Sequence, residues 1–278
     1  QVNCQDGEID MEPIDRERAY RDHHEGALFL HDGTQYEVVE FTEEYPNPSI
    51  TVQPVRTDEY TQTNSEKAVR DVAAEETRNL GDGYKLARGT GTVEIHYTSY
   101  QRKSVRTGEA VGPMRETGLP PIELHTDLVW VETPPSLQEE VLAAVTDQAA
   151  GGHTPGEVME VFGGGLHGAE HGMIKLTPLL FRMDKSDLGG LSTPRHEETG
   201  VPTWFIHDAV EGGVGFSRRI YDRAEQVARR TRERVGSCDC AGTGGCPACI
   251  MDSQCGNQNR FLHTEATVAV LDRLIRRF

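Results

Sequence analysis

Residues 238–255 read CDCAGTGGCPACIMDSQC and hold five of the six cysteines in this 278-residue chain. Their spacing is C-x-C-x5-C-x2-C-x5-C, which contains two close pairs: Cys238 with Cys240, and Cys246 with Cys249. The glycines between the pairs give the backbone the freedom to turn back on itself, so both pairs can reach one ion. Four converging thiolates form a closed tetrahedral Zn²⁺ site without room for water, so the segment predicts a structural rather than a catalytic metal.

The fifth thiol leaves the ligand set open. The ligands are either the two pairs, which we favour because each makes a compact chelate, or the set Cys240, Cys246, Cys249 and Cys255. An iron–sulfur cluster uses the same thiolates and stays an alternative. Disulfides fit less well, because the number of clustered cysteines is odd and the polar N-terminus is not a secretory signal.

Composition restricts the function classes only weakly. The net charge is −17, and 23 arginines stand against 5 lysines, a balance typical of a halophilic protein. An acidic surface usually repels nucleic acid, but at molar salt the Debye length is about 3 Å, so local patches decide binding. Because no apolar run approaches the roughly 20 residues of a membrane span, we expect no membrane partner and a cytoplasmic location. The chain starts with Gln1, and we expect it to be a piece of a longer protein or a processed product.

The N-terminal half has the pattern of a β-rich domain. Asp32-Gly33 suits a two-residue hairpin turn between Leu28–His31 and Thr34–Phe41, since both turn positions require positive φ. Glu66–Leu80 fits a polar helix or an exposed loop. The remaining strand candidates are Ile50–Val55, Thr92–Tyr100 and Leu124–Val131.

Helical periodicity dominates after Thr133-Pro134-Pro135. Ser136 and Glu139 match a capping box for a helix through Ala150. The later candidates are helices at Leu166–Arg182 and Phe216–Val235, a short strand at Thr203–His207, and a closing helix that includes Val270–Phe278. We therefore expect an α+β fold. A β-rich, barrel-like connector would occupy residues 1–135, and a helix-dominated domain with a four-cysteine zinc knuckle would occupy residues 136–278.

A second motif, His167-Gly-Ala-Glu170-His171, matches H-x-x-E-H, the inverted zinc-peptidase pattern. It would place two histidines on one helical face beside a glutamate base. Catalytic zinc also needs a third protein ligand, and nothing singles out Asp187 or Asp208 for that role. A packed helix face is the favoured interpretation, and a zinc metallopeptidase using His167, Glu170 and His171 is the alternative function.

Two further features bear on phosphate chemistry. The loop Gly212–Gly215 lacks the Lys-Ser/Thr of a phosphate-binding loop, and no G-x-x-x-x-G-K-[ST] occurs in the chain, so we interpret the loop as a helix cap. The predicted helix that follows this loop, Phe216–Val235, is the most basic segment of the chain. We name Arg218, Arg219, Arg223, Arg229 and Arg230 as candidate nucleic-acid contacts, because arginine pairs bidentately with phosphate. The alternative is a solvated face whose arginines pair with neighbouring acids.

Three runs occur in order: LHGAEHGMI, IHDAVEGGVGFSRRIYD and CDCAGTGGCPACIMDSQCGNQN. Together they resemble the zinc-binding C-terminal domain of the MrfA-type DEAD/DEAH-box superfamily 2 helicases, over roughly residues 136–278. The earlier run GALFLHDGTQYEVVEF is similar, more loosely, to the β-rich segment that precedes that domain.

The resemblance implies a parent protein that binds ATP and translocates on DNA in repair. It implies that Cys238, Cys240, Cys246 and Cys249 are the zinc ligands, that Cys255 is an additional cysteine, and that H-x-x-E-H is a packing motif. This chain lacks both motor domains of that family. We therefore expect a non-catalytic accessory region whose partners are the motor domains of the parent chain and single-stranded or forked DNA.

Overall fold

The computed structural model describes residues 2–4, 7–9, 11–43, 48–146, 154–240 and 243–278. The chain divides into two compact units, one made of Gln1–Glu66 with Ile95–Ile122 and the other of Lys67–Glu94 with Glu123–Phe278. None of the helices in these described ranges is both long and apolar enough to cross a membrane.

The first unit contains a five-stranded sheet with the order β2-β1-β5-β4-β3. Its elements are β1 (Val2–Cys4), β2 (Gly7–Glu8), α1 (Arg16–Asp22), β3 (Leu28–His31), β4 (Thr34–Thr42) and β5 (Ser49–Val55). The predicted hairpin of β3 and β4 is confirmed, and its turn residues Asp32 and Gly33 have φ of 46° and 75°. The core beneath this sheet is formed by Ala27, Val38, Ile50 and Val52.

Two long neighbouring strands follow, β6 (Glu59–Gly81) and β7 (Tyr84–Ser104), and β8 (Arg115–Glu116) pairs with β7. The sequence prediction of a polar helix or loop over residues 66–80 is wrong, because this segment is part of β6. Its polar composition reflects exposure, since most residues from 70 to 79 face solvent. The turn Asp82-Gly83, with φ of 48° and 82°, sets β6 beside β7, and tertiary pairing overrides the helix-forming alanines and glutamates.

A second sheet has the order β10-β11-β9-β7-β6. Its further strands are β9 (Ile122–Glu132), β10 (Leu188–Thr193) and β11 (Thr203–Asp208), with β11 antiparallel to both neighbours. All six residues of β11 are buried, as expected of a central strand covered on both faces.

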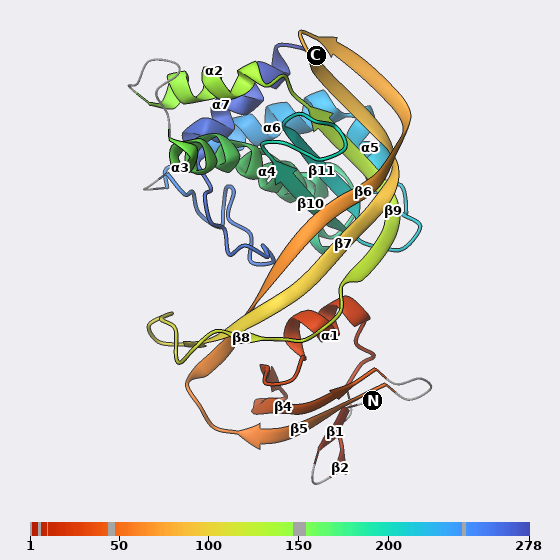
Figure 1. Ribbon diagram of the computed structural model, residues 1–278, viewed down its shortest axis with the longest axis vertical. Helices are drawn as coiled ribbons and strands as arrows, with labels where there is room; N and C mark the ends of the chain where they lie inside the picture. Colours follow the sequence, from red (N-terminus) through yellow and green to blue (C-terminus); the bar gives the residue numbers. More distant parts are fainter. Residues whose placement is uncertain (1, 5–6, 10, 44–47, 147–153, 241–242) are drawn as a thin grey trace. The chain divides into compact units, whose positions relative to one another are not determined.

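Helices pack against one another beside this sheet (Figure 1). They are α2 (Ser136–Val145), α3 (Pro155–Glu157), the π-helical η1 (Val158–Gly163), α4 (Gly164–Leu180), the 3-10 turn η2 (Lys185–Asp187), α5 (Phe216–Asp222), α6 (Ala224–Gly236) and α7 (Thr264–Ile275). Helix α4 packs on both α6 and α7, and α7 also packs on α2. Their shared core includes Phe162, Leu166, Val227 and Leu271, each fully buried.

The predicted α+β fold class is confirmed, with a β-rich, barrel-like N-terminal half and helices after it. Two details differ. The capping box is wrong, because Ser136 is already helical and the N-cap is Pro135, which makes no side-chain cap. The predicted helix at 216–235 is interrupted at Arg223, whose φ of −122° separates α5 from α6. The predicted end of the first helix at Ala150 lies outside the described residues.

The glycines of α4 do not interrupt the helix, because they form its contact surface. Gly164, Gly168 and Gly172 recur every four residues and so share one face. A Cβ on Gly164 would lie 1.7 Å from the carbonyl oxygen of Phe261, and one on Gly168 would lie 2.0 Å from Oγ1 of Thr267. The backbone of α4 therefore approaches its neighbours more closely than any side chain would allow.

Candidate metal centre

The cysteine segment begins where α6 ends and folds into tight turns. The amide groups of Cys249 and Met251 both donate to the carbonyl oxygen of Cys246, at 3.0 and 3.1 Å. Gly245 precedes them with φ of 75°, and a Cβ there would lie 2.5 Å from Ile250 and 3.0 Å from the sulfur of Cys249. Only glycine fits at this position, which brings the second cysteine pair back onto the first.

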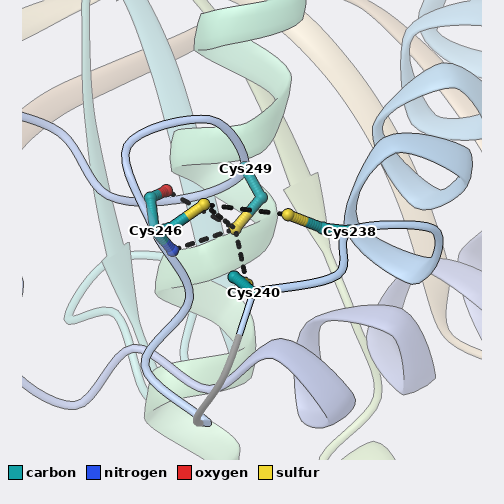
Figure 2. A group of neighbouring side chains, drawn as sticks. All are labelled: Cys238, Cys240, Cys246 and Cys249. Atoms are coloured by element: carbon teal, nitrogen blue, oxygen red, sulfur yellow. Dashed lines mark hydrogen bonds between the residues drawn. The ribbon is translucent and has the colours of Figure 1, made fainter.

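Four sulfurs meet at this turn: those of Cys238, Cys240, Cys246 and Cys249 (Figure 2). Three sulfur–sulfur distances are 3.7 Å: Cys238 to Cys246, Cys240 to Cys249, and Cys246 to Cys249. A tetrahedral Zn²⁺ with Zn–S bonds of about 2.3 Å requires sulfur–sulfur edges of about 3.8 Å. Three of the six sulfur–sulfur edges therefore already have the length that a tetrahedral zinc site needs, and all four sulfurs lie within 4.8 Å of one another.

The electrostatics of the cluster also fit a divalent cation. A hydrogen bond from the backbone at Ala248 lowers the pKa of Cys246 to about 7, whereas a side-chain hydrogen bond to Cys238 raises the pKa of Cys240 to about 12. The thiols thus share protons, because four thiolates so close together repel one another. A metal ion removes that conflict by replacing the protons.

Two side chains of helix α4 form hydrogen bonds with the backbone of the cysteine turn. Nζ of Lys175 donates to the carbonyl oxygens of Pro247 and Met251, both at 2.6 Å. Nδ1 of His171 bonds the carbonyl oxygen of Ile250 at 2.8 Å. Ile250 is fully buried, with Val235 and Leu262 in the same small core. The centre therefore ties α4 and the end of α6 to the segment that leads into α7.

The H-x-x-E-H residues divide between two environments. His167 and His171 lie beside Cys255, and their ligand atoms lie within 4.8 Å of one another. Glu170 is outside this cluster. It is buried against Gly190 of β10 and hydrogen-bonds Ser192, and burial raises its pKa to about 7. The contacts of Glu170 with β10 favour the packed helix face, the interpretation preferred for this motif from the sequence.

The two aspartates considered as a third peptidase ligand are occupied elsewhere. Asp187 accepts a hydrogen bond from the amide of Asp184. The carboxylate of Asp208 accepts from the amides of Val214, Phe216 and Ser217 at 2.7, 3.0 and 2.7 Å. The glycine-rich loop is therefore an internal cap, because an anion of the chain itself takes its free amide groups.

The candidate nucleic-acid arginines lie on α5, on α6 and at Arg223 between them. Arg229 pairs with Glu225 at 2.8 Å and Arg230 with Glu233 at 3.1 Å, all on the exposed surface of α6. Arg219 and Arg223 lie over the rings of Phe216 and Phe181. Exposed pairs of this kind contribute about 0.3–0.5 kcal/mol, so a phosphate can compete with these glutamates.

Comparison with known proteins identifies relatives of this arrangement. The family model of the MrfA Zn-binding domain matches residues 169–250, which include the cysteine turn. The uncharacterised protein MJ1572.1 of Methanocaldococcus jannaschii is 34% identical over 113 residues, which are 40% of this chain and 99% of that protein. The uncharacterised ATP-dependent helicase YprA of Bacillus subtilis is 25% identical over 229 residues, 82% of this chain but 27% of YprA.

Solved structures show the same fold. The crystal structure of the DUF1998 helicase MrfA bound to DNA aligns with 94% of this chain and 31% of its own, with a TM-score of 0.60 and 23% identity. A second structure, with DNA and AMPPNP, aligns with 98% of this chain and 30% of its own at a TM-score of 0.54 and 22% identity. The chain thus spans about a third of these helicases. The matched family and the four-sulfur cluster identify structural Zn²⁺ as the cofactor.

Proposed function

Because the chain belongs to the family of the MrfA Zn-binding domain, we propose that it is the non-catalytic accessory region of an ATP-dependent DNA helicase. The four-sulfur tetrahedron inside the family-matched segment carries this proposal. A closed site of four thiolates leaves zinc without an open coordination position, so the metal stabilises rather than reacts. ATP hydrolysis and translocation then belong to motor domains elsewhere in a DEAD/DEAH-box parent chain.

We assign Cys238, Cys240, Cys246 and Cys249 as the four ligands. Zinc then joins the end of α6 to the turn before α7, and α4 supports both through Lys175 and His171. Such a site contributes on the order of 10 kcal/mol to folding of the segment that holds it. The zinc-pinned helices would present one rigid surface to the motor domains, with the β-rich half as connector or strand guide. A domain boundary near residue 135, a cytoplasmic location and a role in DNA repair stay predictions.

Cys246→Ser tests the structural zinc. We expect the variant to lose this ion, to lose helical circular-dichroism signal and to melt at a lower temperature than the wild type. Ser253→Ala, an exposed substitution in the same loop, is the matched control and keeps all three properties. A Cys246→Ser protein with wild-type zinc content and melting temperature contradicts the assignment. A colourless solution without iron–sulfur absorption separates zinc from an iron–sulfur cluster.

The DNA side of the proposal rests on the arginines of α5 and α6. The solved relative is bound to DNA, and Arg229 and Arg230 are exposed and pair with glutamates of their own helix. Arg229→Ala/Arg230→Ala should weaken binding of single-stranded DNA. It should also reduce the slope of log affinity against log salt by about 1.4, two phosphate contacts at about 0.7 each.

The paired glutamates supply the matched control for this experiment. Glu225→Ala/Glu233→Ala leaves both arginines in place and removes their competing partners, so it should tighten DNA binding. Equal affinity and equal salt slope in wild type and both variants would assign α6 to a solvated surface. Fluorescence anisotropy with single-stranded and forked oligonucleotides of one length measures all of these quantities and compares the two forms of DNA.

A further inference from the structure

A second group of metal-binding side chains lies beside the four-sulfur centre and shares no ligand with it. It consists of His167 and His171 on α4 and Cys255 in the turn before α7. The three ligand atoms lie within 4.8 Å of one another, and Sγ of Cys255 is 3.6 Å from Nε2 of His167. A tetrahedral ion with Zn–N of about 2.05 Å and Zn–S of about 2.3 Å requires an N···S edge of about 3.6 Å.

The histidines are held in orientations that suit ligation. They are four residues apart on one helical face, and their ring centroids are 4.2 Å apart. Nδ1 of His171 bonds the carbonyl of Ile250, an acceptor, so Nδ1 carries the proton and Nε2 keeps its lone pair. His167 is supported by a hydrogen bond to the backbone of Arg260. Metal-binding histidines typically donate their second ring nitrogen to a carbonyl in this way.

Hydrogen bonds within the turn that carries Cys255 fix the conformation of that turn. The side-chain oxygen of Asn259 accepts from the amide of Asp252, and its side-chain nitrogen donates to the carbonyl of Asp252, both at 2.7 Å. The amide of Asn259 also donates to Sγ of Cys255 at 3.3 Å. Gln258 and Asn259 have φ of 61° and 59°, a left-handed conformation that costs free energy in residues other than glycine. The chain thus maintains a strained turn around this thiol.

The surroundings keep the imidazoles in the form that binds metal. Burial lowers the pKa of His167 to about 3 and that of His171 to about 4, so both rings are neutral at pH 7. The carboxylate of Asp252 adds negative charge nearby and pairs with Lys185. Burial raises the pKa of Cys255, so a cation would have to displace the thiol proton.

From this geometry we infer that His167, His171 and Cys255 form a second binding site, for a borderline divalent cation such as Zn²⁺. Three ligands leave the fourth position of a tetrahedral ion to water or an external ligand. Cys255 is the least buried of the three ligands. The site also explains why the fifth clustered cysteine lies apart from the other four.

Zinc titration of the full chain tests this inference. Protein freed of loosely held metal is titrated with ZnCl₂, and bound zinc per chain is measured after gel filtration. The wild type should hold two equivalents, and Cys255→Ala and His167→Gln one each. Cys255→Ala and His167→Gln leave the four cysteines in place, so they should keep the structural ion and the wild-type circular-dichroism signal, and this distinguishes loss of the second ion from loss of the structural one. Glu170→Gln should retain both, because Glu170 faces β10.

Cobalt provides an independent readout. In wild-type protein that holds only the structural zinc, added Co²⁺ should occupy the second site. It should produce visible tetrahedral absorption and the charge-transfer band of one thiolate, and both should disappear in Cys255→Ala. Folding of each variant is checked by far-ultraviolet circular dichroism, and His167→Gln serves if Cys255→Ala does not fold. A wild type that saturates at one zinc overturns the inference, as does a second zinc that persists in both variants. Either result makes the trio a hydrogen-bonded packing contact.

Discussion

Gly168→Ala should destabilise the protein, although alanine is the better helix former. In an exposed helix this substitution stabilises by about 1 kcal/mol. Here the new Cβ would lie 2.0 Å from Oγ1 of Thr267, 3.2 Å from its Cβ and 3.3 Å from Ile250. Thr267 cannot simply rotate away, because its hydroxyl is buried and donates to the carbonyl of His263 at 2.8 Å.

The magnitude follows from these two opposing effects. Overpacking a close contact costs about 1–3 kcal/mol, and a buried hydroxyl that loses its partner costs a further 1–3 kcal/mol or so. After subtraction of the gain in helix propensity, the free energy of unfolding should fall by about 1–5 kcal/mol. Urea unfolding followed by circular dichroism measures it as a lower transition midpoint with an unchanged slope.

Two variants make this experiment decisive. Gly156→Ala is the matched control, because the added Cβ meets nothing nearer than Oγ1 of Thr154 at 3.9 Å. In the double variant Gly168→Ala/Thr267→Ala the obstructing hydroxyl is gone, so it should be at least about 1 kcal/mol more stable than additivity of the single changes predicts. Two results would contradict this reasoning: a Gly168→Ala protein as stable as Gly156→Ala, or additive effects of Gly168→Ala and Thr267→Ala. Either would show that the close approach of α4 and α7 is not the reason why position 168 requires glycine.

Two further predictions concern buried polar groups of β11. Burial lowers the pKa of His207 to about 4, so the unfolded chain binds the extra proton between pH 6.5 and 4 and stability falls as the pH falls through that window. The contribution of His207 to this loss reaches about 3 kcal/mol at pH 4. The difference in stability between pH 7 and pH 4, measured by urea unfolding, should therefore be about 3 kcal/mol smaller in His207→Leu than in the wild type. Asp208→Ala leaves the amides of Val214, Phe216 and Ser217 without their acceptor, so its free energy of unfolding at pH 7 should drop by at least about 3 kcal/mol. Asp208→Asn keeps one acceptor and should lose less, and equal stability of both variants and the wild type would show that the loop is capped in another way.

Local chemistry was readable from the sequence. The hairpin at Asp32-Gly33 forms as expected, because its positive φ angles are a requirement of the turn itself. The spacing of the first four clustered cysteines similarly encodes a local chelate, and the four sulfurs do meet. Both features depend on residues within about a dozen positions of one another.

Long-range pairing was not readable. Residues 66–80 have the composition of a polar helix, and they are a strand because the Asp82-Gly83 turn and β7 impose that pairing. An exposed strand shows no alternating apolar pattern, so its sequence carried no signal of β structure. The Asp82-Gly83 dipeptide is the one local feature that indicates this hairpin.

The cysteine cluster separates what the sequence alone determined from what the tertiary structure decided. Chain spacing determined that two close pairs of thiolates can converge on one ion, and it left Cys255 and an iron–sulfur cluster as alternatives. The role of Cys255 was decided only by folding, because its neighbour His167 is 88 residues away and reaches it through the packing of α4. The same packing places Glu170 against β10. It also explains the glycines of α4, which looked like helix interruptions in the sequence but form the surface that contacts α7. Chelate formation is local, whereas a side chain's neighbours across helices are set by packing that no short stretch encodes.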